Sequence, residues 1–281
     1  MTPLKKRKIH AGVRAGIQLM FFILMPSAFT TAFAGVKYIF VQLGNREPIE
    51  FNAFIKVLSV LLVYTAVFGR FFCGYACAFG SLGDAVRALY MSICKKMKKK
   101  PVAINETMNK LFIYVKYLVL LMIVFVSYKG MATSTKGMSP WDVFSMLRAG
   151  NIEMGAYIIG TVLLVLILIG MAICERFFCR FLCPMGAVFT LIPSIPYLSL
   201  RRTRTNCING CSACKRVCPC NIELSDVSSI EISGECIQCG KCRGICPKQN
   251  VKRTLVPQNF ELCFTIIRAA ILVAILIWAG L

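Results

Sequence analysis

Histidine and acidic side chains are scarce in this chain of 281 residues. It has one histidine, His10, and 12 Asp and Glu against 33 Lys and Arg. A b-type haem needs axial ligands inside a helix bundle, and a c-type haem needs a C-x-x-C-H motif, which is missing. No G-x-G-x-x-G follows a strand-like run, and no nucleophile–base pair is recognisable. These absences argue against haem-based chemistry, a Rossmann-type nicotinamide site and hydrolysis.

Cysteine, in contrast, is abundant and regularly spaced. Twelve of the 16 cysteines fall into four runs. The last two runs are Cys207, Cys211, Cys214 and Cys218 before Pro219, and Cys236, Cys239, Cys242 and Cys246 before Pro247. The final run fits the bacterial ferredoxin pattern C-x2-C-x2-C-x3-C-P. The two runs therefore predict two [4Fe–4S] clusters and an electron carrier.

The composition is too apolar for an ordinary soluble domain, with 57% hydrophobic residues and a mean hydropathy of +0.69. Five apolar stretches approach or reach the length needed to cross a hydrocarbon layer of ~30 Å. They are Ala15–Val36, Phe51–Gly69, Leu111–Tyr128, Met154–Cys174 and Phe260–Leu281, the last with Arg268 at depth. We expect an all-α polytopic membrane protein with four or five transmembrane helices. Its parts are a membrane domain over 1–200, a dicluster ferredoxin domain over 201–255 and a C-terminal membrane segment over 256–281.

The net charge of +21 is distributed asymmetrically. Relative to the expected spans, 25 Lys and Arg fall on one side and 5 on the other, as the positive-inside rule describes. This predicts a bacterial cytoplasmic membrane protein with both ferredoxin runs in the reducing cytoplasm, where cysteines bind metal rather than form disulfides. The basic run Lys95–Lys100 is interpreted as an anchor against anionic lipid, not as a nucleic-acid site.

The first apolar stretch also has features of a cleavable signal peptide. Lys5–Lys8 precede it, and Ala32–Ala34 follow its core. Because the apolar run is long for a signal core, we expect it to be retained as the first span.

The two remaining cysteine runs form an internal repeat. The eleven residues from Arg70 to Gly80 align with those from Arg176 to Gly186, with six identities. Each copy reads R-F-F-C-x3-C-x2-G and follows an expected span. C-x3-C spacing puts two thiols one helical turn apart on one face.

Two such pairs suggest a third metal site held by Cys73, Cys77, Cys179 and Cys183. An iron–sulfur cluster is the favoured occupant. A structural zinc held by the same thiolates, or thiols that only pack, are the alternatives. Arg70 and Arg176 precede the pairs by three residues and are candidate cofactor-binding residues, since their charge would stabilise an anionic cluster; snorkelling to lipid phosphate is their alternative role.

Taken together, these motifs resemble the NapH-type membrane quinol dehydrogenase components and the related NosR and MauN ferredoxin-type membrane proteins. The resemblance covers residues from about 10 to 250. It implies electron transfer between the quinone pool and a redox partner protein through iron–sulfur clusters. The chain departs from the family pattern at Ala78, where the motif has proline, in its apolar C-terminal tail, and in lacking the flavin domain of the nitrous-oxide branch.

In two-cluster ferredoxins the fourth cysteine of each run serves the other cluster. The expected ligands are Cys207, Cys211, Cys214 and Cys246 for the first cluster, and Cys236, Cys239, Cys242 and Cys218 for the second. Gly210 is expected to absorb the extra residue of the first run with a positive φ. Cys220 is a substitute ligand or a buried thiol, and Cys94, Cys174 and Cys263 are treated as small apolar residues.

Two functions remain open at this point. One is an electron-transfer subunit that links quinone, or a cytoplasmic donor, to a partner oxidoreductase. The other is a membrane-anchored redox sensor or metal-reducing assembly factor. The polar residues near span ends that a quinone site would use are Tyr64, Asp84, Lys116 and Tyr117, although interfacial anchoring explains each of them as well.

Overall fold

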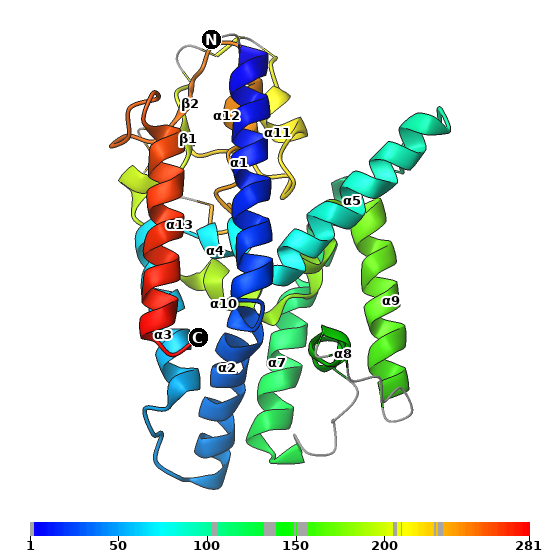
Figure 1. The fold of residues 1–281 in the computed structure, drawn as a ribbon, viewed down its shortest axis with the longest axis vertical. Coiled ribbons are helices and arrows are strands. Elements are labelled where there is room, and N and C mark those ends of the chain that lie inside the picture. The colour runs from blue at the N-terminus through cyan, green and yellow to red at the C-terminus, as the bar shows by residue number, and fades with distance from the viewer. Residues whose placement is uncertain are drawn as a thin grey trace. The chain divides into compact units, whose positions relative to one another are not determined.

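The computed structural model describes residues 3–102, 106–131, 139–148, 150, 157–204, 207–208, 210–227, 229 and 233–281, and it is mostly helical (Figure 1). The longer helices are α1 (Pro3–Leu24), α2 (Ala28–Asn45), α3 (Ala53–Phe68), α5 (Ala78–Lys96), α7 (Val115–Tyr128), α9 (Ile158–Ile173) and α13 (Glu261–Trp278). The shorter ones are α4 (Phe71–Tyr75), α6 (Glu106–Phe112), α8 (Pro140–Arg148), η3 (Phe178–Leu182), α10 (Pro184–Leu191), η4 (Pro196–Leu198), α11 (Ala213–Arg216) and α12 (Lys241–Ile245). Strands β1 (Arg201–Arg202) and β2 (Val251–Lys252) pair antiparallel.

The expected first span is interrupted. Helix α1 ends at Leu24 and α2 begins at Ala28, so the apolar stretch Ala15–Val36 is not one continuous helix. Proline has no N–H and disfavours helical conformation in the residue before it. Pro26 therefore explains why the chain breaks here although its hydrophobicity continues.

Two helical stretches are long and apolar enough to cross a membrane: Met108–Tyr128 and Glu261–Trp278. The pair Arg7–Leu24 and Ala28–Asn45 adds a third if it forms one broken span. Helices α3 and α9 are apolar but shorter. The predicted span Met154–Cys174 begins at residues 154–156, which lie outside the described residues. The structure thus supports a helical membrane protein with two or three candidate spans.

The chain divides into two compact units. Unit 1 comprises Met1–Pro26, Ser59–Ser81 and Val188–Leu281, and unit 2 comprises Ser27–Leu58 and Leu82–Ala187. The ferredoxin segment and the C-terminal helix both belong to unit 1, together with the first C-x3-C pair. The second C-x3-C pair belongs to unit 2.

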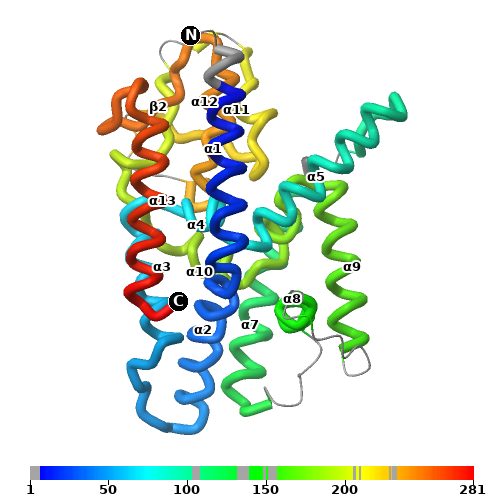
Figure 2. The backbone as a smooth tube through the Cα atoms, in the orientation of Figure 1, coloured from blue at the N-terminus to red at the C-terminus, as the bar shows by residue number. Residues whose placement is uncertain are grey.

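Unit 1 brings together segments from opposite ends of the chain. Helix α1 packs against α12 and α4, so blue and orange segments run together in Figure 2. Leu200, Leu224, Cys242 and Val251 form a small buried core, to which β2 contributes Val251. The β1–β2 pair thereby closes the ferredoxin segment at its two ends.

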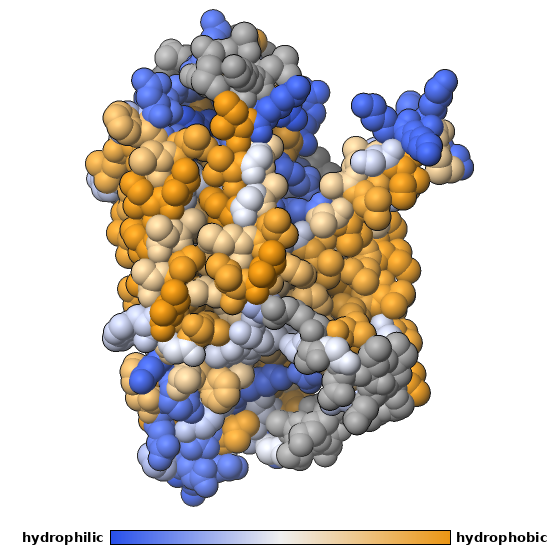
Figure 3. Space-filling model, in the orientation of Figure 1, coloured by the Kyte–Doolittle hydropathy of each residue, from blue (hydrophilic) through white to orange (hydrophobic). Residues whose placement is uncertain are grey.

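Unit 2 is a helical assembly with an aromatic centre. Helix α2 packs on α7, and α8 packs on α9. Phe33 and Trp141 stack with ring centroids 5.4 Å apart, and Phe178 meets Trp141 edge-on at 5.8 Å. The outer face of α9 is apolar and exposed, as Figure 3 shows, and Val162, Leu166 and Ile169 are more than half accessible there. Such a face suits lipid contact.

Candidate iron–sulfur sites

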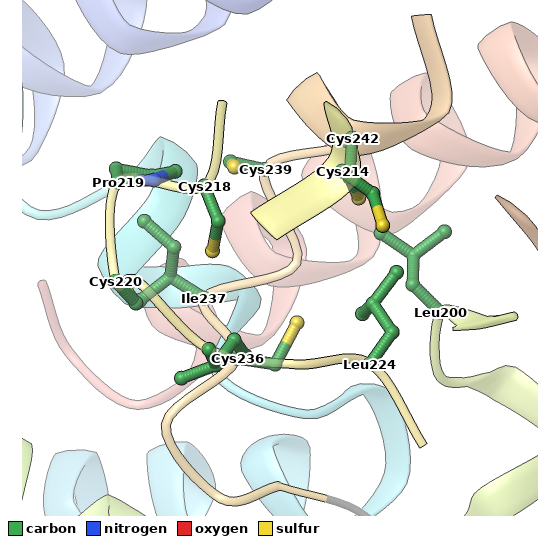
Figure 4. Close-up of a pocket in the computed structure, with 12 residues that line it drawn as sticks. Leu200, Cys214, Cys218, Pro219, Cys220, Leu224, Cys236, Ile237, Cys239 and Cys242 are labelled. Carbon is green, nitrogen blue, oxygen red and sulfur yellow. The ribbon is translucent and has the colours of Figure 1, made fainter. Parts of the chain in front are cut away.

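One cavity in unit 1 is lined by cysteines from both ferredoxin runs. Cys236, Cys239 and Cys242 of the second run meet Cys218 of the first, and Cys214 and Cys220 also border the cavity. Figure 4 shows the sulfurs of Cys218 and Cys236 pointing into the space between the two loops. The cavity thus contains the four cysteines expected to hold the second cluster. Leu200, Leu224 and Ile237 supply apolar walls.

A second cavity is lined by Cys207, Cys211, Cys214 and Cys246, the four cysteines expected to hold the first cluster. Two polar groups point at these sulfurs. Arg202 donates to Cys214 Sγ at 3.4 Å, and the backbone N–H of Asn250 donates to Cys246 Sγ at 3.3 Å. Hydrogen bonds of this kind favour the thiolate over the thiol.

The donor sets fit iron–sulfur clusters in number and type. The first cavity is lined by six cysteines, which include the four predicted ligands, and the second is lined by four. Cysteine thiolates are the ligands that hold [4Fe–4S] clusters. Burial raises the pKa of Cys236 to about 12 and that of Cys242 well above its usual value. A metal bound there would supply the positive charge that favours the thiolate forms.

Left-handed backbone positions shape both cysteine loops. Gln238 and Gly240 have φ of 55° and 72°, which turn the chain between the cysteines of the second run. Gly210 has φ of 73°. The prediction that Gly210 takes a positive φ in the first run is therefore confirmed, and its missing Cβ explains why glycine stands there.

The second cysteine loop lies directly on α4, which carries Cys73. A Cβ on Gly74 would lie 2.3 Å from the Ile237 carbonyl oxygen, so only glycine permits this approach. The Tyr75 hydroxyl donates to the Cys239 carbonyl at 3.4 Å. Arg14 and Gln18 of α1 donate to the Gly74 carbonyl at 3.3 and 3.2 Å. The sequence signal for this contact was Gly74 itself, where the second repeat has Arg180.

The two repeats share a backbone turn that sequence reasoning missed. In each copy the helix ends before its second cysteine, so the pair does not sit on one continuous α-helix. The N–H of Cys77 donates to the Phe72 carbonyl and that of Cys183 to the Phe178 carbonyl, both at 2.9 Å. These i to i−5 bonds form a wide turn of π type. Cys73, Cys77, Cys179 and Cys183 are all buried.

Arg70 and Arg176 occupy equivalent positions in the two repeats, and each forms an ion pair with a carboxylate. Arg70 contacts Glu235 at 3.2 Å and also donates to Thr190 at 2.9 Å. Arg176 donates hydrogen bonds to both carboxylate oxygens of Asp84, from Nε at 2.9 Å and from Nη2 at 2.6 Å. Both guanidinium groups are buried. Each arginine is therefore balanced by a carboxylate and is not an isolated charge.

The remaining polar residues singled out in the sequence have neighbours within their own unit. Tyr64 donates to the Arg268 carbonyl at 2.9 Å, and Asp84 is engaged by Arg176. Lys116 is fully buried, with its ammonium 5.1 Å from the Tyr117 ring centroid. Cys94 and Cys174 are buried, whereas Cys263 is exposed.

Comparison with known proteins agrees with this chemistry. A family described as a 4Fe-4S binding domain matches residues 52–101 and 157–196, the segments that contain the two C-x3-C pairs. An uncharacterized protein of Methanocaldococcus jannaschii is 29% identical over 82% of this chain and 82% of its own length. The ferredoxin-type protein NapH of Haemophilus influenzae is 27% identical over 75% of this chain and 71% of its own length. Protein NirI of Paracoccus denitrificans is 28% identical over 72% of this chain, but the match covers 29% of NirI.

The chain is similar to NapH- and NosR-like ferredoxin-type proteins. The resemblance predicted from the cysteine motifs is thereby confirmed. No solved structure gives a significant match. The relatives and the 4Fe-4S domain support iron–sulfur electron transfer as the role of this NapH-like protein. Its relatives also imply redox partner proteins, and its apolar helices agree with a place in the membrane.

Proposed function

We propose that this NapH-like protein passes electrons between the quinone pool, or a cytoplasmic donor, and a partner oxidoreductase. The observation that carries the proposal is that each thiol-lined cavity in unit 1 combines cysteines of both ferredoxin runs. Iron–sulfur clusters supply one-electron transfer when bound. The chain supplies thiolate ligands, an apolar wall and a scaffold that joins the ferredoxin loops to the membrane helices.

The proposed ligands are Cys207, Cys211, Cys214 and Cys246 for one cluster, and Cys218, Cys236, Cys239 and Cys242 for the other. Cys73, Cys77, Cys179 and Cys183 are proposed to hold a third cluster. The match of a 4Fe-4S binding family to both repeat segments supports this third site. Because α4 contacts the Cys236–Cys239 loop, the distance for electron transfer between a third cluster and the ferredoxin segment would be short.

The charge distribution supports a placement in the bacterial cytoplasmic membrane with the ferredoxin segment in the cytoplasm. The side richer in Lys and Arg includes both ferredoxin runs. The five apolar stretches are proposed as four or five spans, with the break at Pro26 inside the first. This topology puts the clusters at the cytoplasmic interface.

Iron and acid-labile sulfide analysis of purified protein tests the cluster number. Three [4Fe–4S] clusters would give about twelve irons per chain. The double variant Cys73→Ala/Cys179→Ala should lose about four of them. A wild type with about eight irons, unchanged in the double variant, would remove the third cluster from the proposal.

Reduction in membranes tests the donor. Membranes that contain the protein are treated with a menaquinol analogue, and the clusters are followed by EPR. Appearance of reduced-cluster signals supports the link to the quinone pool. Clusters that are present but stay oxidised with quinol, and become reduced with a soluble low-potential donor, would favour the cytoplasmic donor instead.

A further inference from the structure

Helix α13 carries a buried arginine in the same unit as the first thiol-lined cavity. Arg268 is 1% exposed although it lies midway along a candidate span. Within the described residues, its Nε, Nη1 and Nη2 atoms have no hydrogen-bond acceptor. A cation in such surroundings is costly unless an anion compensates it. The helix therefore carries a charge that the protein part of the structure does not neutralise.

Two aromatic rings hold this guanidinium. Its central carbon lies 4.3 Å from the Phe71 ring centroid and 4.8 Å from that of Phe264. Cation–π contacts fix the position of a cation but bring no opposite net charge. The charge of Arg268 thus remains available to a neighbouring anion.

The rings connect Arg268 to the cysteine loop. Phe71 stacks on Tyr75 with centroids 4.3 Å apart, and Tyr75 donates to the Cys239 carbonyl. Cys236 is also within electrostatic range of Arg268. Two stacked rings, Phe71 and Tyr75, therefore link Arg268 to the loop that carries Cys239, one of the cysteines lining the cavity.

Neighbouring arginines differ from Arg268 in their partners. Arg253 forms an ion pair with Glu261 and donates to Gln238. Arg14 donates to the Gly74 carbonyl, and Arg243 to the Gln258 carbonyl. Each of these three arginines donates to at least one acceptor within the protein, and Arg253 is also paired with a carboxylate.

We propose that Arg268 is the counter-charge of the cluster held by Cys218, Cys236, Cys239 and Cys242, and that it raises the reduction potential of that cluster. A [4Fe–4S] centre with four thiolates is anionic, and reduction adds one more negative charge. A fixed cation nearby stabilises the reduced form more than the oxidised form. This explains why Arg268 is buried without an acceptor in the described part of the chain. It also provides the positive charge that the buried thiolates of the cavity need. The inference rests on the proposed iron–sulfur function.

The size of the effect follows from Coulomb's law. At an effective dielectric constant of ~20, one unit charge about 10 Å from a redox centre changes a one-electron equilibrium on the order of tenfold. Tenfold corresponds to about 59 mV for one electron. Arg268→Met removes the charge and keeps much of the side-chain length, whereas Arg268→Lys keeps the charge.

EPR-monitored redox titration of the purified full chain tests the proposal. In Arg268→Met, the cluster signal that Cys242→Ser abolishes should shift to lower potential, with roughly a tenfold lower reduced-to-oxidised ratio at fixed ambient potential. Arg268→Lys should stay near the wild-type potential. The cluster at Cys207 and Cys211 should shift much less in both variants. Thr265→Val, a nearly isosteric neutral change on the buried face of α13, is the matched control and should leave the potential unchanged.

Iron content per chain, measured in wild type and in both Arg268 variants, distinguishes the remaining outcomes. Loss of this cluster in Arg268→Met but not in Arg268→Lys also supports the counter-charge role, since charge is what separates the two variants. An intact cluster with an unchanged potential in Arg268→Met overturns the proposal, and so does equal loss in both variants. A wild-type protein without this cluster would instead refute the proposed function.

Discussion

The contact between Gly74 and the Ile237 carbonyl yields the sharpest stability prediction. In Gly74→Ala the new Cβ would lie 2.3 Å from that oxygen, about 1 Å short of ordinary van der Waals contact. The next atoms, Ile237 C and Cys239 N, are 3.4 and 3.8 Å away, so the clash is concentrated on one backbone oxygen. Backbone cannot rotate aside as a side chain can. The clash can therefore be relieved only if α4 or the loop that contains Ile237 moves.

The expected cost combines two terms of opposite sign. Overpacking costs about 1–3 kcal/mol, and replacing glycine by alanine in a helix returns about 0.5–1 kcal/mol. A net loss of roughly 1–2 kcal/mol is expected. The effect on metal binding should be larger, because metal–ligand distances tolerate about 0.2 Å. A loop displaced by about 1 Å should lose the cluster at Cys236 and Cys239.

The assay compares iron per chain, EPR signals and thermal unfolding of Gly74→Ala with wild type. Gly12→Ala is the matched control, since Gly12 is also in a unit 1 helix and a Cβ there meets nothing within 4 Å. That control should keep its full iron content and gain slightly in stability. Full iron content and an unchanged unfolding temperature in Gly74→Ala would refute the argument that this close approach holds the loop.

Three further predictions test other parts of the molecule. Cys242→Ser should remove the EPR signal of one ferredoxin cluster and leave membrane insertion intact; survival of both signals would show that the ligand assignment is wrong. A periplasm-active reporter should be active after Arg148 and silent after Lys99, and the reverse pattern would move the clusters to the outer face. Asp84→Asn should lower the free energy of unfolding by about 3 kcal/mol, because Arg176 would be left buried without its carboxylate. Asp84→Glu keeps the carboxylate and should retain part of that free energy.

Local features were the part of this molecule that sequence reasoning could predict. The ferredoxin pattern and the positive φ of Gly210 depend on residues close together in the chain, where spacing and steric limits act directly. The helix break at Pro26 also depends on a local signal, the proline itself. It was not predicted, because apolar residues continue on both sides and indicated one continuous span.

Features that depend on distant residues were not predictable in the same way. Arg70 and Arg176 were predicted to stabilise a cluster by their charge, which stays a prediction, but their pairing with Glu235 and Asp84 was not foreseen. These carboxylates lie far along the chain from their arginines, and spacing alone does not reveal them. Arg268 was expected to be problematic at depth, and only the structure shows the aromatic rings that surround it.

The contact between α1 and α12 has a consequence for the order of biosynthesis. His10 lies against Gly240, and Arg7 lies against Gly244, about 230 residues later. A ribosome therefore delivers one side of this contact early and the other only after nearly the whole chain has emerged. Closing contacts of such long separation is slow. Until residues 240–244 are synthesised, the surface of α1 that contacts α12 stays uncovered. The ferredoxin segment can be completed only after that point, so we expect iron insertion to follow translation.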